Sequence, residues 1–360
     1  MGIILSLFLI SYSPYFLTLY PGGQQTAMGG ANVSIAEDAF GIFYNPGGIA
    51  LQNNIDITFE NSSIPEFEYG PFSFFVKTKH WGFGINIPLF PKVNFGFFGT
   101  GIYTSFRDSL LGYHNWVPSY IYIDEILKDF ATGFSFAYKV SDYIGTGVGV
   151  KYIYCSFSEQ YQEYNTVNID RSVGVDFGGL ARYNFLLGNT SFGLAVQNLG
   201  PKMNKDNLPL NIRAGLSYKL SAKDLFNNVR DNWLYNWFYE KWRVVLAYDI
   251  NWIFSDYIFQ TQSSYNERKE KPWHSFGVEL RPVPFFAIRF GHFDNFNTEQ
   301  NNKYRKRDWT IGLGIDLKFL RIDISDNSAF YERNTNCWKV SLSLNIGAPV
   351  FPQNGLLNMP

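Results

Sequence analysis

Alternation of large apolar residues with small or polar ones is the strongest regularity in this sequence of 360 residues. Over residues 309–317, which read WTIGLGIDL, every second residue is large and apolar. A period of two places one kind of side chain on each face of an extended strand, whereas a helix repeats about every 3.6 residues. The same pattern recurs at residues 210–220 and 338–346. The chain is therefore predicted to be built from β-strands.

Similar alternation, with more exceptions, continues along most of the chain from residue 54. We predict about fourteen strands, at residues 55–60, 71–78, 81–88, 130–140, 143–156, 171–185, 189–199, 210–220, 242–254, 272–282, 284–293, 309–317, 319–328 and 338–346.

The chemistry of the polar face separates a soluble β-sandwich from a membrane barrel. In a sandwich this face meets water and is rich in lysine and glutamate, but here it carries many glycines, including Gly82, Gly84, Gly147 and Gly314. Glycine in a strand marks a close approach by another segment. The polar face is therefore predicted to line a partly filled interior, and the apolar face to contact lipid. This is the arrangement of an all-β, transmembrane antiparallel barrel.

Composition excludes two other classes of protein. Charged residues make up 17%, below the roughly 25% of a typical soluble domain. Thirty basic and 31 acidic residues give a net charge of -1, so no overall basic field exists to bind nucleic acid. The mean hydropathy is -0.13 and no run of about 18 apolar residues follows residue 20. Polytopic helical membrane proteins are therefore excluded.

The lengths of the connections predict how the barrel is oriented. Alternate connections are long, with extremes at residues 89–129 and 255–271, and the others shrink to a few residues. Outer-membrane barrels have long extracellular loops and short periplasmic turns. We therefore assign residues 54–347 to a barrel in the cell outer membrane of a Gram-negative-type bacterium. Residues 221–240 are expected to form a periplasmic helical insertion, and residues 348–360 a periplasmic tail.

The first 53 residues precede the barrel. Residues 1–36 contain no charged residue, and a short apolar core precedes Pro14, which favours a signal peptide over residues 1–14. A buried N-terminal strand is the alternative. Residues 15–53 do not alternate but are apolar and rich in glycine. Because a fourteen-stranded barrel has a lumen wider than its own side chains fill, these residues are expected to form an N-terminal hatch inside it.

Sequence motifs in this region resemble a known family. Ala27-Met28-Gly29-Gly30-Ala31 and Tyr44-Asn45-Pro46-Gly47-Gly48-Ile49-Ala50 closely resemble the N-terminal hatch of the FadL-like superfamily. Residues 16–31, which read FLTLYPGGQQTAMGGA, look most like its PorV/PorQ branch, which is associated with type IX secretion. Residues 197–202, 208–219 and 287–291 extend the resemblance, which covers the chain from residue 15.

The resemblance implies a fold, a location and a function. It implies a fourteen-stranded barrel in outer-membrane lipid, with a hatch that contains Met28, Gly29, Gly30, Asn45, Pro46 and Gly47. A PorV-like protein binds the C-terminal signal domains of secreted cargo and passes them from the type IX translocon to the surface attachment machinery. The alternative is a FadL-like transporter of long-chain fatty acids or other hydrophobic small molecules. A purely structural barrel is a third interpretation.

Two groups of side chains are candidates for binding. Residues 89–129 are unusually aromatic for a surface loop, and such density favours partner recognition or lipid contact, although the loop could also fold inward as a lid. The candidate residues are Phe97, Phe98, Tyr103, Trp116 and Tyr120. Charged residues on the polar face are expected to pair with one another and with the hatch, or else to form a path for an anionic ligand. They include Arg213, Arg289, Asp316 and Arg321.

No enzyme signature is recognisable. The histidines His80, His114, His274 and His292 are scattered, and no nucleophile elbow or metal-spaced pair accompanies them. Cys155 and Cys337 are too few for a disulfide framework or a zinc site. We therefore expect no catalysis, no metal, no cofactor and no nucleic acid partner.

Overall fold

A computed structural model gives the fold of the chain. It describes residues 14–19, 21–67, 75–114, 117–161, 164–203, 207–222, 242–254, 272–295, 307–317, 319–326 and 338–347. The predicted signal peptide lies almost entirely outside these residues, as do most of the predicted insertion at 221–240 and the tail at 348–360.

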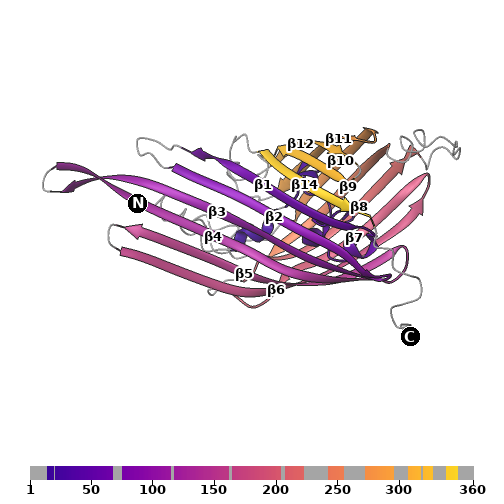
Figure 1. The fold of residues 1–360 in the computed structure, drawn as a ribbon, viewed down its shortest axis with the longest axis horizontal. Helices are drawn as coiled ribbons and strands as arrows, with labels where there is room; N and C mark the ends of the chain where they lie inside the picture. Colours follow the sequence, from indigo (N-terminus) through magenta and orange to yellow (C-terminus); the bar gives the residue numbers. More distant parts are fainter. Residues whose placement is uncertain are drawn as a thin grey trace.

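Fourteen antiparallel strands form one closed barrel (Figure 1). Each strand pairs with its neighbours in sequence, and β1 closes the ring against β14. The strands are β1 (Ile55–Phe67), β2 (Phe75–Phe90), β3 (Val93–His114), β4 (Val117–Lys139), β5 (Ile144–Tyr161), β6 (Tyr164–Phe185), β7 (Gly188–Leu199), β8 (Leu210–Ser221), β9 (Arg243–Phe254), β10 (Trp273–Val283), β11 (Phe286–Asn295), β12 (Arg307–Asp316), β13 (Leu320–Asp326) and β14 (Trp338–Ile346). The predicted fold class is confirmed.

The two faces of the sheet have the predicted chemistry. In β12, Leu313 and Ile315 are 47% and 46% exposed, while Gly314 between them is buried. The same inside-to-outside alternation runs through β7, β8, β9, β10 and β14. Large apolar side chains thus cover the outside, and polar or small ones line the lumen. Such an apolar outer face belongs in lipid, and closure of the ring leaves no strand edge unpaired within it.

The connections divide the barrel into two rims. Both the start of β1 and the end of β14 lie at the rim that carries the short connections, because Ile55 pairs with Ile346. Residues 91–92, 140–143, 186–187, 284–285 and 317–319 form the short connections. This is the periplasmic rim of an outer-membrane barrel.

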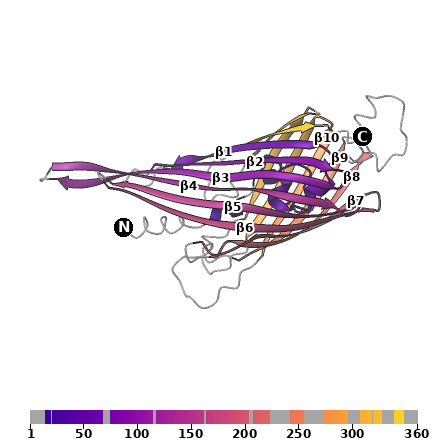
Figure 2. The same cartoon turned by 60° about the horizontal axis from the view of Figure 1, so that its bottom comes forward.

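Strands β3 to β6 reach far beyond the rest of the barrel on the opposite side (Figures 1 and 2). The pairing of β3 with β4 continues to His114 and Val117, and that of β5 with β6 to Tyr161 and Tyr164. By contrast, β13 has seven residues. A membrane needs about 9–11 residues of tilted strand, so these four strands continue well outside the bilayer.

The prediction of a long loop at residues 89–129 was wrong. These residues form β3 and much of β4. The strands predicted at 71–78 and 81–88 both fall on β2, except residues 71–74, which lie outside the described residues. The predicted number of strands was right only because these two errors cancel. The alternation of apolar and polar residues is weak in β3, because both faces of the strand are apolar there. Phe97 faces outward and its neighbour Phe98 faces inward. In β2, the polar pair Lys79 and His80 broke the pattern at the point where the strand leaves the lipid.

The described residues before β1 lie inside the barrel as four short helices and their connections (Figure 2). We call residues 14–54 the N-terminal segment. Its helices are η1 (Pro14–Thr18), α2 (Gly23–Ala27), α3 (Gly41–Tyr44) and η2 (Gly48–Leu51). Proline and glycine keep them short. Within the described residues, no helix of the protein is long and apolar enough to cross a membrane.

Candidate functional site

The N-terminal segment is the most deeply buried part of the chain. Most of its side chains from Pro21 onward are buried, including Met28, Phe40 and Tyr44. Short helices leave many backbone N–H groups without an intrahelical partner, and burying such a group unpaired is costly. The inner wall of the barrel must therefore supply acceptors.

Carboxylates of the wall provide these acceptors. Oδ2 of Asp249 in β9 accepts hydrogen bonds from the backbone nitrogens of Asn32 and Val33, at 2.7 and 2.9 Å. Oδ2 of Asp56 in β1 accepts one from Ala39 N at 2.7 Å, and Glu60 accepts one from the backbone of Gly22. These carboxylates hold the segment at widely separated points of the wall.

Glycines allow the segment to approach the wall closely. Gly29 and Gly30 have φ of 66° and 82°, a left-handed conformation that other residues rarely adopt. On the wall, a Cβ atom at Gly147 would lie 2.4 Å from the backbone oxygen of Pro46. A Cβ atom at Gly193 would lie 2.2 Å from the oxygen of Val33. The glycine-rich polar face therefore serves to seat the N-terminal segment.

Two inward-facing glycines of β5 provide a matched test of this seating. Replacing Gly147 by alanine should displace the segment, because the new methyl group collides with backbone atoms of Pro46. Overpacking of this kind costs about 1–3 kcal/mol. At Gly149 the nearest atom to an added Cβ is 3.6 Å away, so its alanine variant should behave like the parent. Urea unfolding, followed by the heat-modifiable gel shift, measures both variants. Equal midpoints for the two would contradict the seating.

An arginine-rich cluster on the wall fixes the middle of the segment. Arg321 in β13 pairs with Asp38 of the segment and, through Nε, with Oδ2 of Asp323 at 2.9 Å. Arg289 in β11 bridges Asp323 and Glu279, with both contacts at 2.7 Å. Because Arg289 and Glu279 are buried, their charges are compensated by each other instead of by water.

The same cluster extends to Glu37 of the segment. Arg243 in β9 lies 2.7 Å from Glu279 and 2.9 Å from Glu37, while Lys219 lies 2.9 Å from Glu37. Burial raises the pKa of Glu37, but the charges of Arg243 and Lys219 outweigh this effect and hold that pKa well below its ordinary value. Glu37 therefore stays ionised and bound at neutral pH.

A smaller buried cluster lies next to it along the wall, on β14, β1 and β2. Oε1 of Glu60 is 3.0 Å from Nδ1 of His80, and Oε2 is 3.3 Å from Nζ of Lys339. Nε2 of His80 is 3.1 Å from the hydroxyl of Thr100. All four side chains are buried. This cluster and the Gly22 hydrogen bond hold the segment beside β1, β2 and β14.

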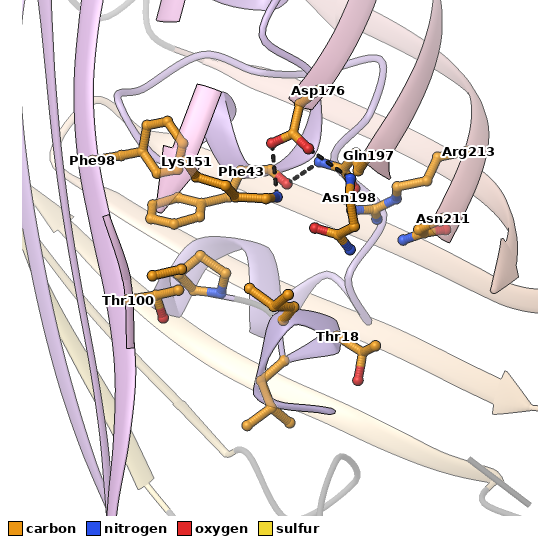
Figure 3. Close-up of a pocket in the computed structure, with 14 residues that line it drawn as sticks. Thr18, Phe43, Phe98, Thr100, Lys151, Asp176, Gln197, Asn198, Asn211 and Arg213 are labelled. Carbon is orange, nitrogen blue, oxygen red and sulfur yellow. Dashed lines mark hydrogen bonds and ion pairs between the residues drawn. The ribbon is translucent and has the colours of Figure 1, made fainter. Parts of the chain in front are cut away.

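Between η1 and the wall lies a small cavity of about 30 Å³ (Figure 3). One side is apolar, formed by Leu17, Leu19, Phe43, Phe98 and Ala131. The other side is polar and comes from β5, β6, β7 and β8; it comprises Lys151, Asp176, Gln197, Asn198, Asn211 and Arg213.

The polar side of this cavity is neutralised internally. Nζ of Lys151 is 2.8 Å from Oδ2 of Asp176, whose Oδ1 accepts a hydrogen bond from the backbone of Asn198 at 2.7 Å. Arg213 pairs with Asp249 at 3.7 Å, and its guanidinium carbon lies 4.8 Å from the centre of the Tyr44 ring. The cavity therefore presents apolar surface and paired charges to whatever enters it.

The predicted site residues lie in several places. Met28, Gly29, Gly30, Asn45, Pro46 and Gly47 all belong to the N-terminal segment and are buried there. Arg289 and Arg321 belong to the arginine-rich cluster. Asp316 lies beside it, because Asp316 is 2.7 Å from Arg281, whose Nε is 3.8 Å from Glu279 of the cluster. Arg213 lies apart from them, beside the cavity. The structure thus favours mutual pairing of the lumenal charges over a path for an anionic ligand.

The aromatic candidates do not form one surface. Phe97 is 40% exposed on the outer face of β3, whereas Phe98 is 2% exposed and faces the lumen. Tyr103 also lies in β3, Tyr120 belongs to β4, and Trp116 lies outside the described residues. Adjacent residues of a strand point to opposite faces, so Phe97 and Phe98 cannot contact the same partner.

Glu60, His80 and Asp56 are anchors that were not predicted from the sequence. Asp56, Thr58 and Glu60 alternate on the inward face of β1, so their parity marks them as lumenal. His80 was dismissed as scattered because β2 was divided into two strands at that position. Among the described residues, no group of His, Cys, Asp and Glu side chains could hold a metal ion.

Comparisons with known proteins address the fold. No protein-family model and no curated protein matches the sequence. Among solved structures, the toluene transporter TbuX of Ralstonia pickettii is similar, with a TM-score of 0.56 and 11% identity over 91% of this chain and 98% of that one. The toluene transporter TodX of P. putida is similar, with a TM-score of 0.54 and 11% identity over 91% of this chain and 99% of that one.

These values show a shared architecture over nearly the full length of each chain. Together with the closed ring, the apolar outer face and the two unequal rims, they assign a location. The protein is a fourteen-stranded outer-membrane β-barrel of a Gram-negative-type bacterium, with the fold of these two solved structures.

Proposed function

We propose that the protein is a transporter that admits small hydrophobic compounds through the outer membrane. The observation that carries this proposal is the cavity between η1 and the wall, within a barrel whose fold is shared with two toluene transporters. Ligand sites are typically concave and mostly apolar, with a few polar groups that fix orientation. The apolar side of the cavity fits this description.

Charge pairing around the cavity supports a neutral compound as the substrate. Lys151 is paired with Asp176, and Arg213 with Asp249. Binding an anion would require breaking one of these pairs, which leaves a buried charge uncompensated. An uncharged hydrocarbon needs only an apolar surface, which Phe43, Phe98, Leu17 and Leu19 provide. Because the cavity holds about one water molecule as it stands, entry of a ligand requires the N-terminal segment to move.

Adjacent phenylalanines of β3 provide the test. Uptake of radiolabelled toluene into proteoliposomes should be well above that of empty liposomes. Phe98→Trp should reduce uptake, by about tenfold if filling the cavity costs about 1.4 kcal/mol. Phe97→Trp, on the lipid face, should leave uptake unchanged. Parent uptake equal to that of empty liposomes would exclude the transporter function.

A PorV-like role in protein secretion is the second candidate. The resemblance of residues 16–31 to the PorV/PorQ branch favours it. The continuation of β3 to β6 beyond the bilayer also supports it, since these strands offer a large surface to a protein partner.

Secretion and uptake can be measured in the same host. Deletion of the gene should abolish surface attachment of proteins that carry type IX signal domains if this second function is correct. Affinity capture from gently solubilised outer membranes should then recover the translocon and cargo. Loss of attachment with unchanged hydrocarbon uptake would favour secretion, and the reverse would favour transport.

A further inference from the structure

On the outer face of β2 to β6, aromatic side chains are followed by basic ones at a similar height above the periplasmic rim. Trp81 lies nine residues from the end of β2 at Phe90, and Phe130 lies nine from the end of β4 at Lys139. Tyr154 lies ten residues from the start of β5 at Ile144. A tilted strand crosses the bilayer in about 9–11 residues. These rings therefore stand at the outer boundary of the hydrocarbon layer, where aromatic side chains gather.

Tryptophans on the short side of the barrel mark the same boundary. Trp338 lies eight residues from the end of β14 and is 54% exposed, and Trp309 lies seven from the end of β12 and is 69% exposed. The agreement between the two sides fixes the level of the outer leaflet on the barrel.

Three cations lie just above this aromatic level. Lys79 and Lys128 are each eleven residues from the periplasmic ends of β2 and β4, and Arg171 is fourteen residues from the end of β6 at Phe185. All three side chains are exposed. Their neighbours in sequence, His80, Asp129 and Ser172, occupy the alternate strand positions that face the lumen. The three cations therefore point to the outside.

Strand register brings the cations together. Lys79 is opposite Tyr103, which is opposite Lys128 on the next strand. Phe130 is opposite Tyr154, which is opposite Arg171. The guanidinium carbon of Arg171 is 6.0 Å from the centre of the Tyr154 ring, and that ring stacks on Phe130 at 5.0 Å. Adjacent strands are about 4.8 Å apart, so the cations span roughly 19 Å of the outer wall.

Among the side chains that the structure describes, no carboxylate of β1 to β6 lies on this surface. Those carboxylates alternate with the outward-facing residues and have lumenal positions: Asp56, Glu60, Asp129, Asp170 and Asp176. None of the three cations makes an ion pair with a described residue. The surface is therefore an unpaired positive region directly above a ring of aromatic side chains, at the level of lipid headgroups.

We infer that Lys79, Lys128 and Arg171 bind a phosphorylated glycolipid of the outer leaflet, of the lipid A type. Lysine and arginine bind phosphate through charge-assisted hydrogen bonds. One phospholipid phosphate would engage one cation, whereas cations spread over five strands match a wide headgroup with more than one phosphate. Tyr103 between the two lysines offers a ring and a hydroxyl group to the sugars. This inference is independent of what the barrel transports.

Binding of purified lipids tests the inference. The folded barrel in detergent is titrated with bisphosphorylated lipid A, its dephosphorylated form and phosphatidylglycerol, and bound lipid is counted by native mass spectrometry. Replacing all three cations by glutamine should weaken binding of bisphosphorylated lipid A on the order of a hundredfold, because each cation near an anionic membrane surface contributes roughly a fivefold factor. Lys92→Gln, at the periplasmic rim, should bind like the parent.

Several results would overturn the inference. These are equal affinity of parent and triple variant, equal loss in Lys92→Gln, or equal binding of phosphatidylglycerol and lipid A. The heat-modifiable gel shift establishes that each variant is folded. A second measurement needs no charge substitution: a photoreactive amino acid at position Ser156, between the cations, should cross-link to glycolipid in intact cells. Cross-linking to a protein instead would assign this surface to a protein partner.

Discussion

Replacing Asp249 by alanine is expected to release the N-terminal segment and convert a closed barrel into a conducting one. The side chain is buried and holds the backbone of Asn32 and Val33 together with Arg213. Removing one partner of a buried ion pair costs about 3–5 kcal/mol. Most of this free energy should be lost only from the state in which the N-terminal segment occupies the lumen. The open probability in planar bilayers should then rise on the order of a hundredfold or more.

Two controls separate release of the segment from general damage. Asp142→Ala also removes one carboxylate, but at an exposed turn where the partner is Lys139 at 2.8 Å, so it should conduct like the parent. Asp249→Asn keeps an acceptor oxygen without the charge and should fall between parent and alanine variant. The barrel of each variant must still show the heat-modifiable shift. An Asp249→Ala barrel that is folded and conducts no more than the parent would contradict the anchoring role.

Placing arginine at Leu313 is expected to impair assembly of the barrel. Leu313 is 47% exposed on the outer face of β12, and three residues separate it from the periplasmic end of the strand. An arginine on the lipid face costs about 2–4 kcal/mol at mid-membrane and less near the boundary. The measurement is the folded fraction in the heat-modifiable gel shift after refolding into lipid.

Asp316→Asn is the matched lumenal change on the same strand. It weakens the 2.7 Å contact with Arg281, which keeps Glu279 at 3.8 Å as a second partner. The barrel should therefore fold, with altered electrostatics in the lumen. Leu313→Phe, which keeps the apolar character, should also fold. If Leu313→Arg folded like the parent while Asp316→Asn failed, the assignment of lipid and lumen faces would be inverted.

Transport through the lumen has a structural requirement that surface binding of a protein partner does not share. The N-terminal segment must leave or rearrange within the lumen, because it is anchored there to Asp249, Asp56 and Arg321. The anchors are ion pairs and hydrogen bonds, which break and reform without loss of the apolar outer face. A ligand that competes for these groups would open the lumen while the barrel stays intact.

Local pattern determined the fold class and the orientation of the side chains. Leu313 and Gly314 differ in exposure because successive residues of a strand point to opposite faces. This alternation can be recognised from the types of neighbouring residues. The glycines of the polar face predicted an occupied lumen, and the segment at residues 14–54 fills it. The unequal connections predicted the two rims. These are all properties that a few adjacent residues set on their own.

The tertiary structure determined where the strands begin and end, which the alternation of residue types does not reveal. Residues 93–114 form β3 because they pair with β2 and β4, although the inward Phe98 obscures the alternation by packing against Phe43 of the N-terminal segment, with ring centres 5.1 Å apart. Where a strand leaves the lipid, its outer face no longer needs apolar side chains, so Lys79 could interrupt the pattern without ending β2. Strand ends therefore depend on the bilayer and on partners distant in sequence.

Sequence alone identified lumenal charges such as Arg213, Arg289 and Arg321, but not their partners. Arg321 meets Asp38 across 283 positions of the chain, and Asp249 meets Asn32 across 217. The odd or even position of a residue along its strand fixes the face on which its charge lies. Strand register and the path of the N-terminal segment fix which opposite charge it reaches. The sequence by itself thus determined a closed barrel, apolar outside and polar within, and only the closed ring of fourteen strands brought the anchors of that segment together.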